Sequence, residues 1–212
     1  MSDYGKLTEA ILNGDSRTAV AVTQEALAAQ ADPQDLVTKY MIPAMDEIGK
    51  RFETGDCFVP ELLISARAMK ASLQLIRPLL AARGAEPVGR VIIGTVKGDL
   101  HDIGKNLVKM MAQGAGIEVV DLGIDVSADK FVQGLKDNPD ARTIGISALL
   151  TTTMTGMKDV IDRFEKEGLR KKVKFMVGGA PLTDQYAREI GADGYAPDAA
   201  SAAEKIKAFL RA

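Results

Sequence analysis

The sequence predicts an α/β chain in two parts: an N-terminal four-helix bundle over residues 1–85, and a doubly wound parallel sheet of five strands over residues 90–212. Two observations support this division. Up to residue 85, apolar residues recur at helical spacing and extended runs are absent. After residue 90, short apolar runs alternate with helical stretches, which is the pattern of a parallel sheet flanked by helices.

Four helices are expected in the first part. The first covers residues 4–12, and the second begins after Asp15, a residue type that caps helix N-termini. The third begins at Asp32-Pro33 and runs to Gly55, and the fourth opens at Phe58-Val59-Pro60. Short connections between amphipathic helices predict a compact bundle.

The second part is expected to follow a linker at Gly84-Ala85-Glu86-Pro87. Strands are expected at residues 90–95, 117–121, 143–147 and 173–177, with a short one around Gly194-Tyr195. Helices are expected at residues 103–113, 128–136, 155–167, 183–190 and 199–210. This order predicts a flavodoxin-like or Rossmann-like sheet, which binds ligands where its strands end. His101, Ser147 and Gly178 all follow strands or end them, so we expect them to converge.

Composition excludes several classes of protein. The net charge is −2 and charged residues make up 26% of the chain, so no basic excess points to nucleic acid. No apolar run approaches the roughly 20 residues that cross a bilayer, and no signal peptide is visible, so we expect a cytoplasmic protein without a membrane partner. Cys57, the single cysteine, excludes an internal disulfide; a packed side chain is a better interpretation than a thiolate ligand.

The first strand is followed by Asp99-Leu100-His101-Asp102-Ile103-Gly104, which holds the only histidine of the chain. The simplest interpretation is structural, with His101 capping a helix or bonding a backbone carbonyl. The turn lacks both Gly-x-Gly-x-x-Gly and a P-loop ending, which disfavours a nicotinamide or nucleoside triphosphate site. No Ser-His-Asp set, zinc ligand group or second histidine is present either.

Together with Ser147-Ala148-Leu149 and Gly178-Gly179, this segment resembles the Asp-x-His-x-x-Gly signature of cobalamin-binding domains. The resemblance implies cobalamin or a related corrinoid as cofactor, with His101 as the lower axial ligand of cobalt and Gly104 closing the motif. It implies that Asp99 accepts the proton of the other ring nitrogen. The relay extends to a hydroxyl that falls on Thr153, where methionine synthase has serine.

The same resemblance implies a pocket for the nucleotide tail of the corrinoid. Ser147 would hydrogen-bond the tail base, Leu149 would pack on it with Thr151 nearby, and Gly178 and Gly179 would leave it room. The alternative is that these glycines only form turns.

Gly49 to Leu62, followed by Ala66-Arg67-Ala68-Met69, resembles the helical cap of cobalamin-dependent methionine synthase and of methyltransferase corrinoid proteins. Carried over by position, Phe52, Val59 and Leu62 would cover a methyl group on cobalt. The alternative is that all three belong to the bundle core. Residues 84–89 are the expected hinge of a moving cap.

The resemblance therefore implies a corrinoid protein that carries a methyl group on cobalt between two methyltransferases. The first would take it from a methylamine, methanol or a methoxylated aromatic, and the second would pass it to tetrahydrofolate or a thiol. A reductive activase is a further expected partner, and the chain itself is expected to be a non-catalytic subunit. Two alternatives remain: a mutase subunit, which would not need the helices of residues 1–84, and a cobalamin light sensor, for which the cap lacks tryptophan and a DNA-binding domain has no room.

Overall fold

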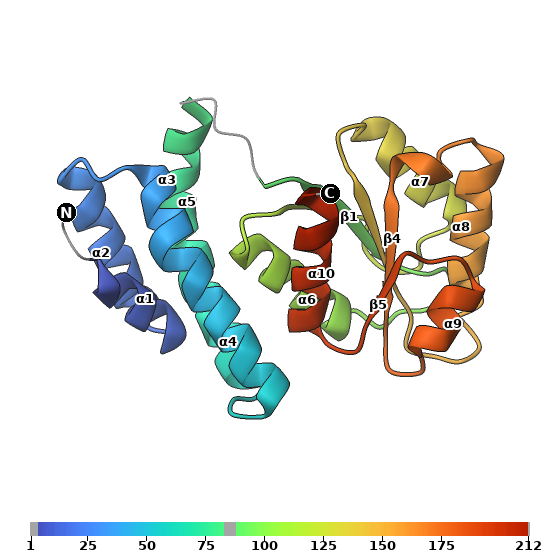
Figure 1. Cartoon of the computed structure of the whole chain (residues 1–212), viewed down its shortest axis with the longest axis horizontal. Helices are drawn as coiled ribbons and strands as arrows, with labels where there is room; N and C mark the ends of the chain where they lie inside the picture. Colours follow the sequence, from blue (N-terminus) through green and yellow to red (C-terminus); the bar gives the residue numbers. More distant parts are fainter. Residues whose placement is uncertain (1–3, 83–87, 212) are drawn as a thin grey trace. The chain divides into compact units, whose positions relative to one another are not determined.

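The computed structural model describes residues 4–82 and 88–211, which fall into two compact units, one helical and one α/β (Figure 1). The linker predicted at residues 84–87 lies outside the described residues. Within the described ranges, no helix is both long and apolar enough to span a bilayer.

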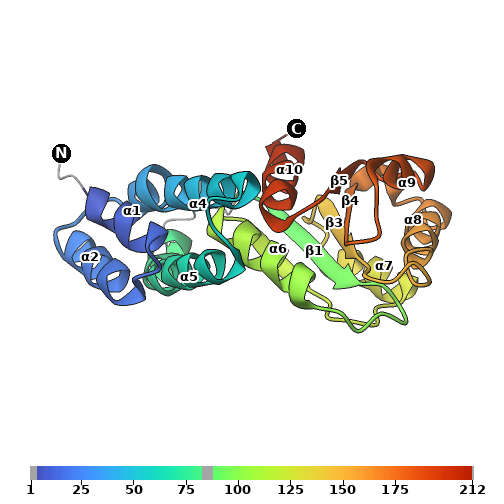
Figure 2. The same cartoon turned by 90° about the horizontal axis from the view of Figure 1, so that it is seen from below.

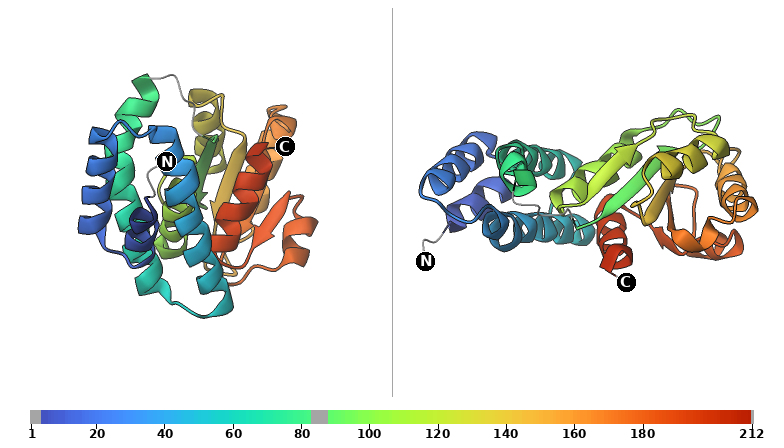
Figure 3. Two further views of the ribbon diagram at one scale, coloured as in Figure 1. Left: turned by 60° about the vertical axis from the view of Figure 1, so that its left-hand side comes forward. Right: turned by 90° about the horizontal axis from the view of Figure 1, so that it is seen from above.

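The helical unit is a bundle, as predicted, and Asp15 caps one of its helices by accepting the Thr18 N–H at 3.0 Å. Its helices pack against one another with short connections (Figure 3). Their bounds are α1 Gly5–Leu12, α2 Ser16–Ala28, α3 Pro33–Asp35, the π-helical segment η1 Leu36–Met41, α4 Ile42–Thr54 and α5 Val59–Ala82.

The predicted third helix is divided into α3, η1 and α4, which follow one another without a break. Pro43 explains the π turn, because it has no N–H to donate to the carbonyl of Lys39 and so removes one α-helical bond. The neighbouring carbonyl of Tyr40 accepts the hydroxyl of Thr8 at 3.0 Å. The bundle therefore absorbs the irregular turn through a contact between helices.

The α/β unit is built on a parallel five-stranded sheet of order β2-β1-β3-β4-β5, which confirms the predicted fold class. Helices α6 and α10 cover one face, and α7, α8 and α9 cover the other (Figures 1 and 2). The bounds are β1 Arg90–Thr95, α6 Ile103–Gly114, β2 Glu118–Asp121, α7 Ala128–Asp137, β3 Thr143–Ser147, α8 Gly156–Lys166, η2 Arg170–Lys172, β4 Lys174–Gly178, α9 Asp184–Glu189, β5 Gly194–Ala196 and α10 Ala199–Arg211.

A core cluster joins the central strands to α7, α8 and α9, and Phe164 meets Phe175 edge-on at 5.1 Å between ring centroids. Two predicted strands differ from the observed ones: β2 begins one residue later than predicted, and β4 is shifted by one residue at both ends, from 173–177 to 174–178. Ile117 donates its N–H to Ala112, so β2 begins one residue later. Gly178 pairs with both Ser147 and Ala196, so β4 extends to it. The chain order switches direction between β1 and β3, which places their carboxyl ends side by side.

Candidate functional site

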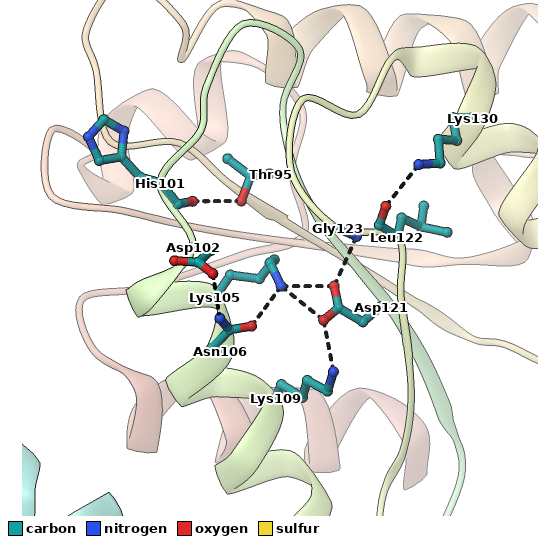
Figure 4. A network of polar contacts seen from close by, with 10 residues as sticks. All are labelled: Thr95, His101, Asp102, Lys105, Asn106, Lys109, Asp121, Leu122, Gly123 and Lys130. Atoms are coloured by element: carbon teal, nitrogen blue, oxygen red, sulfur yellow. Dashed lines mark hydrogen bonds and ion pairs between the residues drawn. The ribbon is translucent and has the colours of Figure 1, made fainter.

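The loop after β1 folds back tightly on the strand end. Asp99 donates its N–H to the carbonyl of Val96 at 3.1 Å, and Gly98 supplies the positive φ of +81° that such a turn needs. The hydroxyl of Thr95 donates to the carbonyl of His101 at 2.9 Å (Figure 4). These bonds fix the loop backbone on both sides of the histidine.

Asp99 is the centre of this loop, and its side chain is fully buried. One carboxylate oxygen lies 2.7 Å from Nδ1 of His101 and accepts the His101 N–H at 3.0 Å. The other accepts the N–H of Leu149 at 2.8 Å and the hydroxyl of Thr153 at 2.7 Å. Burial acts to raise the pKa of Asp99, but these four donors together hold that pKa well below its usual range. Asp99 is therefore ionised and joins the ends of β1 and β3.

His101 is held by this carboxylate with half of its side chain exposed. An ionised Asp99 can only accept, so Nδ1 carries the proton, and in the neutral ring Nε2 then bears the lone pair. In Figure 4 the ring points away from the polar network around α6. The arrangement leaves Nε2 available as a metal ligand, oriented by a carboxylate in the way that metal-binding histidines usually are.

Five large apolar side chains in the segments that follow the strand ends are exposed to water. They follow three adjacent strands: Leu100 and Ile103 after β1, Ile124 after β2, and Leu149 and Leu150 after β3. Leu100 is 69% exposed and Ile103 is 76% exposed. We call these five residues the apolar rim. Such a group at one sheet edge indicates a binding surface for a broad apolar ligand. Apart from Leu149, the rim was not among the predicted site residues, although each member lies in the loop or the first helical turn that follows a strand.

The predicted glycines meet different surroundings. A Cβ on Gly179 would lie 1.8 Å from the carbonyl oxygen of Ala148, and its φ is +140°, so this position accepts only glycine. A Cβ on Gly178 would meet only the carbonyl of Ala196, at 3.3 Å, and a Cβ on Gly104 would meet nothing within 4 Å. The remaining predicted residues of this edge are Ser147, which ends β3 half-buried, and Thr151, which is exposed.

A second polar network, which sequence reasoning missed, lies between α6 and β2 (Figure 4). The buried Lys105 donates to both oxygens of Asp121, at 2.8 and 3.0 Å, and Lys109 donates at 2.8 Å. Burial acts to raise the pKa of Asp121, but these bonds and one from Gly123 lower it to about 2. The network anchors the first turns of α6, which follow His101. Asp121 ends β2, so the strand-end rule was the signal that could have found it.

The predicted cap residues lie in the helical unit and differ in exposure. Leu62 is buried, Phe52 is half-buried, and Val59 is 36% exposed beside Phe58, which is 68% exposed. Cys57 is buried, donates weakly to the carbonyl of Ile48, and has its thiol pKa raised by burial. Among residues 4–82 and 88–211, no three His, Cys, Asp or Glu side chains gather as a metal-binding group.

Comparison with protein families identifies the family of this chain and the class of its cofactor. A family model described as a B12 binding domain matches residues 89–204, and a second model with the same description matches residues 4–77. The chain belongs to the B12-binding family. Its cofactor is cobalamin or a related corrinoid, as predicted. The residues present fit such a cofactor, because the Asp99-His101 pair offers one ring nitrogen and the apolar rim offers a surface beside it.

Relatives of this B12-binding protein cover nearly its whole length. The dimethylamine corrinoid protein of Methanosarcina barkeri is 43% identical over 97% of this chain and 96% of its own. Trimethylamine corrinoid protein 1 of Methanosarcina acetivorans is 41% identical over 97% of this chain and 95% of its own. The predicted resemblance to corrinoid proteins of methyltransferase systems is thus confirmed.

Solved structures agree with the fold. A cobalamin-binding protein from Desulfitobacterium hafniense has a TM-score of 0.81 at 30% identity, covering 98% of both chains. A chain of the methanol:cobalamin methyltransferase complex MtaBC from Methanosarcina barkeri has a TM-score of 0.84 at 29% identity, covering 97% of this chain and 78% of that one. Relatives of this chain therefore act in methyltransferase systems.

Proposed function

We propose that this chain is the methyl carrier of a methyltransferase system, taking a methyl group from a substrate-specific methyltransferase and giving it to a second one. The bound corrinoid supplies a cobalt centre that accepts and releases methyl groups. A methylamine is the favoured donor, because the relatives named above include dimethylamine and trimethylamine corrinoid proteins. Methanol or a methoxylated aromatic is the alternative methyl donor. Tetrahydrofolate or a thiol is the proposed acceptor, and a reductive activase is the proposed partner that restores the reduced cofactor.

The observation that carries this proposal is the hydrogen bond between His101 and the ionised Asp99. We propose His101 as the lower ligand of cobalt through Nε2. Asp99 keeps the proton on Nδ1 and makes the other nitrogen a better donor. Thr153 donates its hydroxyl to the same carboxylate and stabilises its charge. Asp99 and Thr153 would thus hold the proton at Nδ1 of His101 while Nε2 binds the metal.

We propose that the nucleotide tail of the corrinoid lies against Ser147, Leu149, Thr151, Gly178 and Gly179, with Gly104 leaving space near the motif. Gly178 supports this proposal best. Its Cβ position meets one carbonyl, that of Ala196, at 3.3 Å, which is a tight contact but far less crowded than the position of Gly179. Gly179 has a sufficient structural reason in the carbonyl of Ala148, so its presence alone does not argue for a tail.

We also propose that residues 1–85 and 90–212 act as separate domains, the first shielding the methyl group through Phe52, Val59 and Leu62. Exclusion of water and oxidants protects a reduced metal centre from side reactions. Val59 supports this role because it is exposed beside Phe58, whereas the burial of Leu62 also fits a place in the core.

The central test replaces His101 and its carboxylate partner in reconstituted protein. We expect the cobalt(II) state to show nitrogen coupling from imidazole in electron paramagnetic resonance spectra. His101→Ala should abolish the coupling, and Asp99→Asn should weaken it, because the amide is a poorer acceptor and cannot fix the tautomer. Asp102→Asn is the matched control, since the side chain of Asp102 bonds Asn106 and not the histidine. Coupling that persists in His101→Ala would exclude His101 as the ligand.

A further inference from the structure

We propose that Asp125, in the loop after β2, is a positioning residue that holds the His101 loop in the conformation needed to bind cobalt. This inference rests on the proposed ligand role of His101. Asp125 belongs neither to the Asp-x-His-x-x-Gly segment nor to a strand that carries it. Its part would be to fix the turn from which Asp99 and His101 project.

The backbone of Asp125 is unusual. Its φ is +52°, and among the described residues Gln30 is the other non-glycine residue with a positive φ. This region is unfavourable for residues with a side chain, although aspartate tolerates it better than most. Glycine would adopt this conformation without strain. The presence of a carboxylate here therefore requires a reason beyond the turn.

Two hydrogen bonds supply that reason. The carboxylate of Asp125 accepts the N–H of Gly98 at 2.7 Å, and its own N–H donates to the carbonyl of Asp99 at 3.1 Å. Gly98 and Asp99 form the second half of the tight turn of residues 96–99, and His101 follows two residues later. Asp125 therefore contacts this turn on two successive residues, through a side chain and a backbone group at once.

Asp125 can hold the turn because its own loop is attached to the sheet. Thr95 donates its N–H to the carbonyl of Gly123 at 3.0 Å and accepts the N–H of Val126 at 2.9 Å. Val126 also forms a parallel bridge with Val96. The loop after β2 thus continues the pairing with β1 past the end of the regular strands. The turn bearing Asp99 is linked through Asp125 to this paired segment.

A local role for the side chain does not explain these contacts. A turn aspartate usually bonds a backbone N–H one or two residues further along its own loop. The carboxylate of Asp125 instead bonds Gly98, which lies 27 residues earlier in the sequence. The bond joins the loops of neighbouring strands, and one of these loops carries the histidine.

The test compares Asp125→Gly with Asp125→Asn in the full-length protein. Glycine removes the carboxylate but suits the positive φ, so the fold is kept, whereas asparagine keeps both an acceptor oxygen and tolerance of this backbone. In the cobalt(II) form, we expect the ratio of histidine-ligated to unligated cofactor to fall about fivefold to tenfold in Asp125→Gly, the loss expected for one intramolecular hydrogen bond. Asp125→Asn should stay within about twofold of the unmodified protein.

A second readout needs no cofactor. In the cofactor-free protein, Asp125→Gly should speed amide hydrogen exchange at Gly98 by about the same factor, while Asp125→Asn should not. Gln30→Gly is the matched control, because it relieves the same kind of backbone strain in the helical unit and should change neither readout.

The outcomes separate this inference from the ligand assignment. An unchanged ligation ratio in Asp125→Gly, with or without faster exchange at Gly98, overturns the positioning role while leaving the His101 signal of the unmodified protein intact. Asp125→Asn behaving like Asp125→Gly also overturns it, because the acceptor oxygen would then be irrelevant. Coupling that survives in His101→Ala overturns both proposals.

Discussion

The two units place their candidate residues by different means. In the α/β unit, Asp99 is fixed by five hydrogen bonds from four residues, and Gly179 by the carbonyl against which it lies. In the helical unit, Phe52, Val59 and Leu62 present only apolar atoms, and their exposure ranges from buried to exposed. Polar bonds specify one geometry, whereas apolar packing accepts several side chains of similar volume. Substitutions of candidate residues should therefore destabilise the α/β unit much more than the helical unit.

The largest effect is expected at Gly179. Gly179→Ala places a Cβ where the carbonyl oxygen of Ala148 lies at 1.8 Å, and neither backbone segment can move without disturbing the end of β3. We expect a loss of about 3 kcal/mol or more in unfolding free energy, together with loss of corrinoid binding. Urea unfolding and cofactor titration measure the two effects.

Gly55 and Gly168 provide controls for this substitution, one in each unit. Both have positive φ, and a Cβ on either would meet nothing within 4 Å. Gly55→Ala and Gly168→Ala should therefore cost only about 1 kcal/mol, from backbone strain alone. Equal losses at Gly55, Gly168 and Gly179 would contradict the crowding seen beside Ala148.

A smaller effect is expected from acid. The pKa of Asp121 is lowered to about 2 in the folded chain, against about 4 for an unfolded aspartate. Its stabilising contribution is present above the unfolded value and is lost as the pH falls from about 4 to about 2. Asp121→Asn should cost about 2 kcal/mol at neutral pH and progressively less toward pH 2, by the usual conversion of pKa shifts.

Amide hydrogen exchange in β1 measures the loss of stability at low pH in the α/β unit alone. Asp15 is the comparison in the helical unit: its pKa is lowered by the side-chain hydrogen bond from Thr18, but it is fully exposed. Asparagine also caps helices well, so Asp15→Asn should leave the acid profile of β1 unchanged. The stability of β1 against exchange could also fall with pH equally steeply in Asp121→Asn and in the unmodified chain between pH 4 and pH 2. That result would show that the lysine bonds do not stabilise the fold.

The smallest effect on stability is expected in the helical unit. Val59→Ala removes partly exposed methyl groups, so the unfolding free energy should change by less than about 0.5 kcal/mol. If Val59 shields the cofactor, the reduced corrinoid should nevertheless oxidise faster and the bound methyl group should be photolysed more readily. Leu79→Ala is the control, since Leu79 is 40% exposed on the same helix, α5, far along the chain. Equal oxidation rates in both variants would argue against a shield at Val59.

The features that were predictable from sequence are those with a periodic or positional signal. The apolar runs predicted the observed bounds of β1 and β3, and the strand-end rule predicted that His101, Ser147 and Gly178 lie at one edge of the sheet. The bond from Thr153 to Asp99 was expected from family resemblance, because a hydroxyl 54 residues away leaves no local pattern. The cofactor was predicted from the resemblance of residues 99–104 to the Asp-x-His-x-x-Gly signature.

The remaining features depend on tertiary contacts that no local pattern encodes. Lys105 reads as a solvent-exposed helix residue, yet its side chain is buried against Asp121. Asp125 reads as an ordinary loop residue, since neither its positive φ nor its bond to Gly98 follows from its neighbours. The π turn before Pro43 was missed because the apolar spacing continues through it.

The burial of Asp99 has a consequence for what this edge of the sheet can tolerate. Its carboxylate accepts backbone N–H groups from two loops, so an apolar residue in its place would leave those donors buried without a partner. The same side chain that orients the imidazole also joins the loop after β1 to the loop after β3. The position of the histidine and the stability of this edge therefore depend on one carboxylate.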